Sequence, residues 1–312
     1  KIISDAYPKY QTSEIAEASL SSAAVAKDWI TRNFLFDTEL QTVALALRKK
    51  NHKISDPVFS TAFDFAENNL QSLYKRTPQQ SAGSLLPCPY PSFVSATGRF
   101  QEFYYWDLYF ISRHLLVTGR VEAVQMIVEN FLEQVRRFGF VPNGTRDYYL
   151  SRSQPPFLSA MVRELVTRSK KTSLKWLRAR AYPLVKADYE NFWMNPQTRF
   201  DEKTGLNHHW DLLNLPRPER HKNDNEESLG ETYRDVRAAA ESGFDFCKTF
   251  GGCASNVAGT ALNSLLYKTE IDLAWMADLL GKPDEASRFR SAAMRRRSAI
   301  LRHLWNEEEG RF

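Results

Sequence analysis

Apolar residues recur three and four positions apart along most of this chain, which is the pattern of helices that bury one face. The clearest segment is 121–137, where apolar residues from Val121 to Val135 fall on one side. Comparable patterns predict helices over residues 29–50, 57–74, 108–118, 158–167, 174–193, 271–280 and 283–305, and alanine content predicts a short helix over 234–241. No stretch shows convincing alternation of polar and apolar residues, so the pattern predicts an all-α fold.

Helix pairs alternate with long irregular loops that are rich in proline, glycine, aromatic and charged residues. The interruption over residues 77–98 contains Pro78, Pro87, Pro89 and Pro91, which exclude a helix there. Loops of that length are uncommon in compact domains unless they are functional. Since no fixed-period repeat indicates a solenoid, the arrangement predicts a helical toroid whose loops build a pocket at one end.

The composition is that of an ordinary globular protein, with 312 residues, 43% of them hydrophobic and 25% charged. No run approaches the roughly 18 apolar residues that span a bilayer, so no membrane span is expected. The net charge is +5, and the densest basic cluster, residues 295–297 with Arg302, falls on a predicted helix. We interpret this cluster as a solvated helix face and expect no nucleic-acid partner.

The stretch from Gly98 to Asp107 concentrates candidate chemistry. It combines a cation, two carboxylates and five aromatic rings: Arg99, Glu102, Asp107, Phe100, Phe103, Tyr104, Tyr105 and Trp106. Aromatic rings stack on the apolar faces of sugars, and charged groups form the stronger hydrogen bonds to sugar hydroxyls. The stretch therefore indicates a sugar site, although a buried helix start whose charges pair with each other fits the same residues.

Five motifs together suggest a family. Gly98-Arg-Phe-Gln-Glu-Phe-Tyr-Tyr-Trp-Asp-Leu-Tyr109 resembles the first signature of the trehalases, glycoside hydrolase family 37. The other four follow in the family's order: Val141-Pro-Asn-Gly144, Tyr149-Leu-Ser-Arg-Ser-Gln-Pro-Pro156, Arg217-Pro-Glu219 and Ala240-Glu-Ser-Gly-Phe-Asp-Phe246. The resemblance extends over residues 85–312.

The resemblance implies an all-helical (α/α)6 toroid that hydrolyses α,α-trehalose to two glucose molecules with inversion. It implies that Asp245 is the general acid. For Glu241, four residues earlier, we expect a structural ion-pair role rather than a catalytic one. The implied substrate-binding residues are Arg99, Phe100, Tyr104, Trp106, Asp107, Asn143, Arg152, Gln154, Arg217, Glu219 and Gly243. Asn143 has other interpretations, as a turn residue or as the acceptor of the glycosylation sequence Asn143-Gly-Thr145.

The implied reaction explains why these residue types are needed. Trehalose joins two anomeric carbons, so its cleavage needs a proton for the bridging oxygen and a base that activates water on the opposite face. No cofactor takes part, and no metal is expected, since Cys88, Cys247 and Cys253 lack metal-ligand spacing. The expected partner is an uncharged disaccharide. The compartment and the oligomeric state stay open.

The family's second signature and its general-base glutamate are expected beyond residue 312. The chain would then resemble the N-terminal portion of a trehalase, with a toroid incomplete at its C-terminus. Residues 1–76 would be a helical lead-in packed on the toroid, and residues 77–312 the first part of the catalytic domain, in one continuous domain overall. Residues 1–312 alone are expected to be nearly inactive, because an inverting mechanism needs its base.

Departures from the family pattern keep two other interpretations open. Ala96-Thr-Gly98 replaces Pro-Gly-Gly, Phe244 replaces a tryptophan, and Cys247-Lys-Thr-Phe250 replaces Ser-Ser-Arg-Trp. These changes allow a related inverting α-glucosidase that acts on another disaccharide. A non-catalytic sugar-binding or helical interaction module that retained the fold is the third interpretation.

Overall fold

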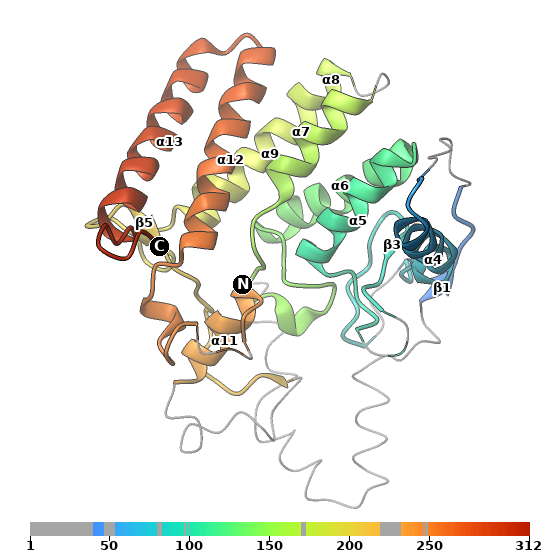
Figure 1. Cartoon of the computed structure of the whole chain (residues 1–312), viewed down its shortest axis with the longest axis horizontal. Coiled ribbons are helices and arrows are strands. Elements are labelled where there is room, and N and C mark those ends of the chain that lie inside the picture. The colour runs from blue at the N-terminus through green and yellow to red at the C-terminus, as the bar shows by residue number, and fades with distance from the viewer. Residues whose placement is uncertain are drawn as a thin grey trace, which may run out of the picture.

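The computed structural model describes residues 40–46, 54–79, 83–96, 98, 100–169, 173–218, 232–245, 247 and 249–312. Helices dominate these residues, and each strand is only two or three residues long. Figure 1 shows most of the long helices grouped above, with α11 (Tyr233–Ser242) and several irregular segments below them. A mostly helical fold is thus confirmed.

The longer helices are α4 (Pro57–Leu73), α5 (Tyr105–Val117), α6 (Val121–Phe138), α7 (Leu158–Arg168), α11 (Tyr233–Ser242), α12 (Thr260–Leu279) and α13 (Pro283–His303). Residues 174–193 form one continuous helical run of α8 (Leu174–Trp176), η3 (Leu177–Ala181), α9 (Tyr182–Ala187) and η4 (Asp188–Trp193). In this run η3 and η4 are π-helical. The short 3-10 helices are η2 (Asp147–Tyr149) and η6 (Ala254–Asn256).

The predicted helix boundaries follow local chemistry. Asp56 caps α4, because its carboxylate accepts hydrogen bonds from the backbone N–H groups of Val58, at 2.8 Å, and Phe59, at 3.1 Å. Gly139 ends α6 in the left-handed conformation, with φ at 87°. The helices predicted over 57–74 and 121–137 are therefore confirmed to within a residue of each end.

Among the described residues, one large hydrophobic cluster joins α4, α5, α6, α7, the helical run 174–193, α12 and α13. The face predicted for α6 is buried in it, and α6 packs against α5, α7 and α9. Phe131 of α6 meets Tyr105 of α5 edge to face, with ring centroids 5.0 Å apart. Because Tyr105 opens α5 and is fully buried, this packing fixes the helix start that follows the candidate motif.

The helix predicted over residues 29–50 is wrong for residues 40–46, and the rest of that prediction lies outside the described residues. β1 (Gln41–Thr42) pairs antiparallel with β2 (Tyr74–Arg76), which pairs antiparallel with β3 (Ser92–Phe93). Val43 and Leu45 are partly buried while Ala44 and Ala46 are exposed, so the same apolar residues satisfy a strand period. The apolar spacing of this segment fits both a helix and a strand, and pairing with β2 stabilises the strand.

A second hairpin also contradicts the expectation that the chain lacks strands. β4 (Phe200–Asp201) pairs antiparallel with β5 (Leu206–Asn207), and Gly205 takes a positive φ of 72° in the turn. Strands of two residues are too short to show alternation in a sequence.

Helix α12 begins well before the start predicted at residue 271. Its early turns carry the buried polar residues Asn263, Thr269 and Glu270 among buried leucines. Polar residues on the core-facing side obscure the apolar period, so the first half of this helix escapes a periodicity analysis.

The arginine cluster in α13 is not wholly a solvated face, which corrects the interpretation of residues 295–297. Arg296 is only 3% exposed and donates from Nε to Glu270 at 2.8 Å. Its Nη1 donates to the side-chain oxygens of Asn207, at 2.8 Å, and Asn263, at 2.9 Å. Arg295 and Arg297 are exposed, as expected. Arg296 therefore ties α13 to α12 and β5.

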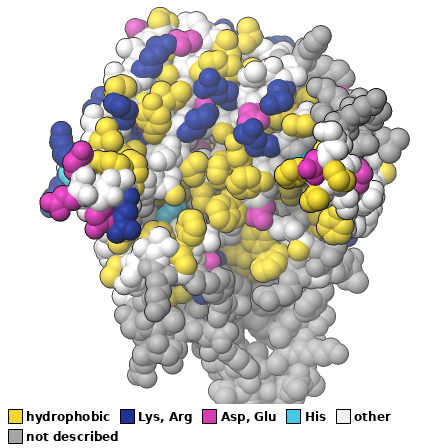
Figure 2. Space-filling view, viewed as in Figure 1, with side chains coloured by type: hydrophobic (Ala, Val, Ile, Leu, Met, Phe, Trp, Pro, Cys, Tyr) yellow, Lys and Arg dark blue, Asp and Glu magenta, His cyan; other side chains and the backbone are white. Residues whose placement is uncertain are grey.

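The surface in Figure 2 carries apolar side chains across its middle, with Lys and Arg side chains among and above them. The exposed large apolar residues of the described helices include Phe110 and Val117 of α5 and Leu279 of α12. Among the helices that the structure describes, none combines the length and the apolar character needed to cross a membrane.

Substitution R296M should lower the free energy of unfolding by about 3 kcal/mol, because it leaves the buried Glu270 carboxylate without its cation. Urea denaturation measures this loss. R297M, one position along the same helix and exposed, is the matched control and should change stability by less than about 0.5 kcal/mol. Equal effects of the two substitutions would show that the buried ion pair contributes nothing.

Candidate active site

Two of the candidate motifs meet at Gly243. This glycine ends α11 with φ at 79°, a left-handed conformation. A Cβ at this position would lie 2.5 Å from Cη2 of Trp106, which is in the first turn of α5. Only a glycine therefore lets the indole ring lie against the backbone here. The contact brings the opening motif beside the segment that carries the predicted acid.

Asp245 follows two residues later and pairs with Arg217. Its Oδ2 lies 3.1 Å from Nη1 of Arg217, which is itself buried. The Asp245 side chain keeps 20% of its surface exposed. The carboxylate is thus held on one side by a buried cation and is accessible on the other.

Gln154 joins a further motif to the same place. Its Oε1 accepts a hydrogen bond from the backbone N–H of Trp106 at 3.1 Å. Arg152 donates from Nε to Oδ1 of Asn143 at 3.2 Å, and the Asn143 carbonyl accepts from the N–H of Tyr105 at 3.2 Å. Asn143, Arg152 and Gln154 therefore surround the start of α5.

Phe100 is strained and exposed. It has φ at 60°, which is unusual for a residue other than glycine, and 51% of its surface is accessible. Its ring meets Tyr104 edge on, with centroids 6.1 Å apart. The left-handed conformation costs roughly 1–2 kcal/mol, and such strain concentrates at functional sites. An aromatic ring held at that cost is suited to stacking on a ligand.

The two carboxylates of the opening motif differ in surroundings. Glu102 accepts from Nε of Arg146 at 2.8 Å and from the hydroxyl of Tyr104 at 2.9 Å, so it is paired within the protein. Asp107 lies in the first turn of α5 without capping it, since the N-cap is Tyr104. Burial raises the pKa of Asp107. The alternative of a charge-paired helix start thus holds for Glu102.

The remaining predicted residues either lie outside the described part of the chain or are buried. Arg99, Glu219 and Phe246 lie outside the described residues. Asn143 and Thr145 are buried, and Oγ1 of Thr145 accepts from the N–H of Phe103 at 3.0 Å. The sequon is therefore inaccessible to glycosylation in the folded chain.

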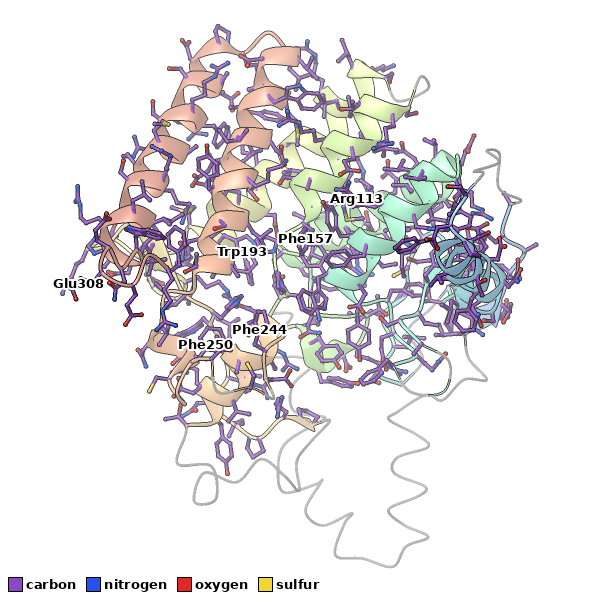
Figure 3. The ribbon with its side chains drawn as sticks, in the orientation of Figure 1. Arg113, Phe157, Trp193, Phe244, Phe250 and Glu308 are labelled. Atoms are coloured by element: carbon purple, nitrogen blue, oxygen red, sulfur yellow. The ribbon has the colours of Figure 1, made fainter. Side chains whose placement is uncertain are left out.

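The segment around Asp245 carries two aromatic side chains, Phe244 and Phe250. Phe244, which precedes the aspartate, is 42% exposed and lies on the loop after α11 (Figure 3). Phe250, later in the same loop, packs near the imidazole of His209, with ring centroids 6.4 Å apart.

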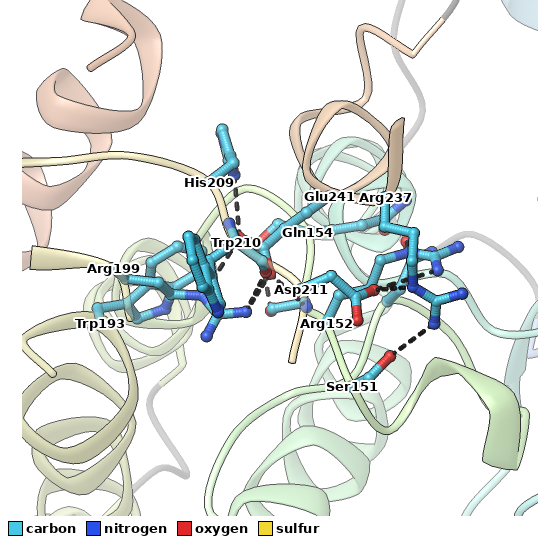
Figure 4. A network of polar contacts seen from close by, with 12 residues as sticks. Ser151, Arg152, Gln154, Trp193, Arg199, His209, Trp210, Asp211, Arg237 and Glu241 are labelled. Carbon is cyan, nitrogen blue, oxygen red and sulfur yellow. Dashed lines mark hydrogen bonds and ion pairs between the residues drawn. The ribbon is translucent and has the colours of Figure 1, made fainter. Parts of the chain in front are cut away.

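Glu241 lies at the centre of a buried polar network (Figure 4). Its Oε2 accepts from Nη2 of Arg199 at 2.6 Å and from the N–H of Ser153 at 2.8 Å. Burial raises the pKa of this carboxyl, but the opposing effect of Arg199 and His209 is larger and brings the pKa down to about 2. Glu241 is thus an internal ion-pair partner, as expected.

Asp211 forms a second buried centre beside the first (Figure 4). Its Oδ2 lies 2.9 Å from Nε of Arg237 in α11 and 3.5 Å from Nη1 of Arg152. Arg237 also donates to the hydroxyl of Ser151 at 3.0 Å. Two buried carboxylates therefore connect α11 to the loops that carry the predicted binding residues.

Sequence reasoning missed most of this network. Arg199, His209 and Asp211 lie in an irregular segment where no period marks a residue as buried. Arg237 did leave a signal, because it shares one face of an alanine-rich helix with Glu241, four residues later. Two charged residues on the face that packs inward indicate a buried polar role.

Known proteins resemble this chain over the region that contains the candidate motifs. A sequence model of the family described as "Trehalase" matches residues 53–312. The chain belongs to the trehalase family.

Individual trehalases support this assignment. The chain is 35% identical over 254 residues to a periplasmic trehalase of Escherichia coli O1:K1 / APEC, which covers 73% of this chain and 44% of that protein. A putative periplasmic trehalase of Salmonella typhi matches equally well. Neutral trehalase Nth1 of Saccharomyces cerevisiae superposes with a TM-score of 0.63 at 28% identity, over 70% of this chain and 47% of that one. The chain thus spans less than half the length of these trehalases.

In this trehalase-family chain, G243A should both destabilise the fold and disturb the candidate site, because the new methyl group meets the Trp106 ring. G139A is the matched control: it has the same helix-ending conformation, φ at 87°, and open space around the added Cβ. G139A should cost about 1 kcal/mol, the price of the left-handed conformation. G243A should cost more and should also alter Trp106 fluorescence. Equal losses in urea denaturation would contradict the close contact.

Asp188 supports the loop that carries Asn143. Its Oδ1 accepts from the N–H of Val141 at 3.3 Å, and the side chain is buried. Burial raises the pKa of Asp188 to about 7, outweighing the Val141 N–H and the Arg199 charge, which lower it. Nothing in the helical period of residues 174–193 marks this position.

The contribution of Asp188 to stability should therefore fall as pH rises from about 4 to about 7, since the folded state holds a proton on Asp188 that the unfolded chain releases. D188N removes this titration. The free energy of unfolding of D188N minus that of the wild type should increase by roughly 4 kcal/mol between about pH 4 and about pH 7. Urea denaturation at stepped pH measures the difference, with D64N on the exposed side of α4 as control. A difference that is constant with pH would refute the buried proton.

Proposed function

We propose that this chain contributes the acid half of a site that hydrolyses α,α-trehalose to two glucose molecules with inversion. The observation that carries the proposal is the meeting of three separate motifs in the segment from Gly243 to Asp245. Asp245 pairs with Arg217 and follows Gly243, which packs on Trp106. The trehalases that resemble this chain support the choice of substrate.

In the proposed mechanism Asp245 donates a proton to the oxygen that links the two sugars. A proton donor must carry its proton when the substrate is bound. In the free protein Arg217 faces the Asp245 carboxylate at 3.1 Å. When trehalose binds, a sugar hydroxyl would take over the Arg217 contact, and the Asp245 carboxyl would face the bridging oxygen to which it donates its proton.

The remaining residues would bind the sugar rings. Phe100 offers an exposed ring for stacking, and Trp106 lines the contact with Gly243. Asn143, Arg152 and Gln154 lie buried around the start of α5, and they are assigned to hydroxyl contacts through the family resemblance alone. Arg99, Tyr104, Asp107 and Glu219 are assigned to the same cleft through the family resemblance. An inverting mechanism also needs a base, for which we propose a glutamate outside residues 1–312.

We further propose that the helices of residues 77–312 belong to an (α/α)6 toroid, on which residues 1–76 pack. The match to a yeast trehalase structure and the position of the candidate loops at one end of the helices support this architecture.

D245N in the full-length protein should lower kcat for trehalose by roughly 100- to 10,000-fold, because general acid catalysis contributes that much. Glucose release measures the loss, and calorimetry should show that trehalose still binds. D64N, which removes an exposed carboxylate, should leave glucose release unchanged. Full activity of D245N would refute the assignment. Trehalose binding without turnover in the wild type would instead favour a sugar-binding module, and turnover of another disaccharide in a panel would favour a related glucosidase.

A further inference from the structure

The strongest unexplained feature is the position of Glu241 relative to the acid. Glu241 lies in the last turn of α11, two residues before Gly243 and four before Asp245. Its side chain is fully buried. The chain therefore has only a short segment between this carboxylate and the group proposed to donate the proton.

Glu241 receives contacts from three chain segments outside its own helix. Oε2 accepts from the N–H of Ser153 and from Nη2 of Arg199. Oε1 accepts from the N–H of Trp210 and from Nε of Arg199, and lies 3.1 Å from Nδ1 of His209. All five contacts fall between 2.6 and 3.2 Å. A single carboxylate thus fastens the end of α11 to three other segments.

These segments lead directly to the candidate binding residues. Ser153 lies between Arg152 and Gln154 in the chain, and Gln154 holds the N–H of Trp106. Trp210 precedes Asp211, which pairs with Arg152. The middle of α11 has a separate attachment through Arg237 and Asp211, so Glu241 fixes chiefly the last turn, from which the acid follows.

We infer that Glu241 is a positioning residue for the reaction: its buried carboxylate sets where Asp245 lies relative to the bound sugar. The inference rests on the proposed function, and it assigns Glu241 no contact with the substrate. A glutamine cannot replace it, because one of its two terminal groups would be an NH2. In either orientation that NH2 would face N–H donors, from Ser153 and Arg199 or from Trp210 and Arg199.

Two substrates separate positioning of the acid from general damage. Cleavage of trehalose breaks a C–O bond, and the departing glucose oxygen takes the proton of the acid. Hydrolysis of α-glucosyl fluoride breaks a C–F bond, and fluoride leaves as an anion without needing that proton. The attacking water adds its oxygen to the anomeric carbon and loses its proton to the base in both reactions.

In the full-length protein, E241Q should lower kcat for trehalose roughly 100-fold, the loss typical of a misplaced catalytic group. Its kcat for α-glucosyl fluoride should change far less, as should that of D245N. E270Q is the matched control, since Glu270 is equally buried and paired with Arg296 at 2.8 Å but lies outside the candidate site. E270Q should lower stability without changing the ratio of the two rates.

Three results would overturn the inference while leaving the proposed function intact. They are normal trehalose turnover by folded E241Q, equal losses of E241Q on both substrates, and a rate ratio in E270Q that shifts like that of E241Q. If D245N instead loses both substrates alike, the acid assignment itself fails. If E241Q does not fold, H209A can replace it, because H209A removes one contact to Glu241 and leaves the Arg199 pair in place. Its loss in kcat should again be larger for trehalose than for α-glucosyl fluoride, and smaller than the loss in E241Q.

Discussion

A carboxylate without access to water must find its partners inside the protein, and Glu241 is where this chain meets that constraint. Leaving such a charge unpaired costs several kcal/mol, so the loss of any one of its partners is strongly unfavourable. Arg199, Ser153 and Trp210 come from loops that carry no regular structure of their own. The shared partner turns these loops into one unit at the end of α11.

The helices were largely predictable because their burial repeats with the helical period. α6 and α13 begin where the pattern begins, and glycine or proline marks one of their ends. The failures have a common physical cause. At residues 40–46 the apolar spacing satisfied two periods at once, and in α12 buried polar residues interrupted the pattern. Periodicity records only apolar burial, so elements that bury polar groups or pair briefly as strands stay hidden.

The candidate site was predictable only through motifs. Trp106, Asn143, Gln154, Arg217 and Asp245 stand in motifs that resemble a family, and the structure brings them together. The groups that hold them had no such signal, because an isolated Arg, His or Asp in an irregular segment looks the same whether buried or solvated. Arg296 shows the same limit, since only the positions of Glu270 and the two asparagines distinguish it from its exposed neighbours.

The burial of Asn143 and Thr145 imposes an order of events on any cell that attaches oligosaccharides to such tripeptides. Enzymatic transfer needs an accessible asparagine, whereas the finished loop encloses this one against Arg152. A glycan could therefore be added only to the nascent chain, and its bulk would then keep the loop from closing around the start of α5. Rapid folding of this segment would protect it from modification.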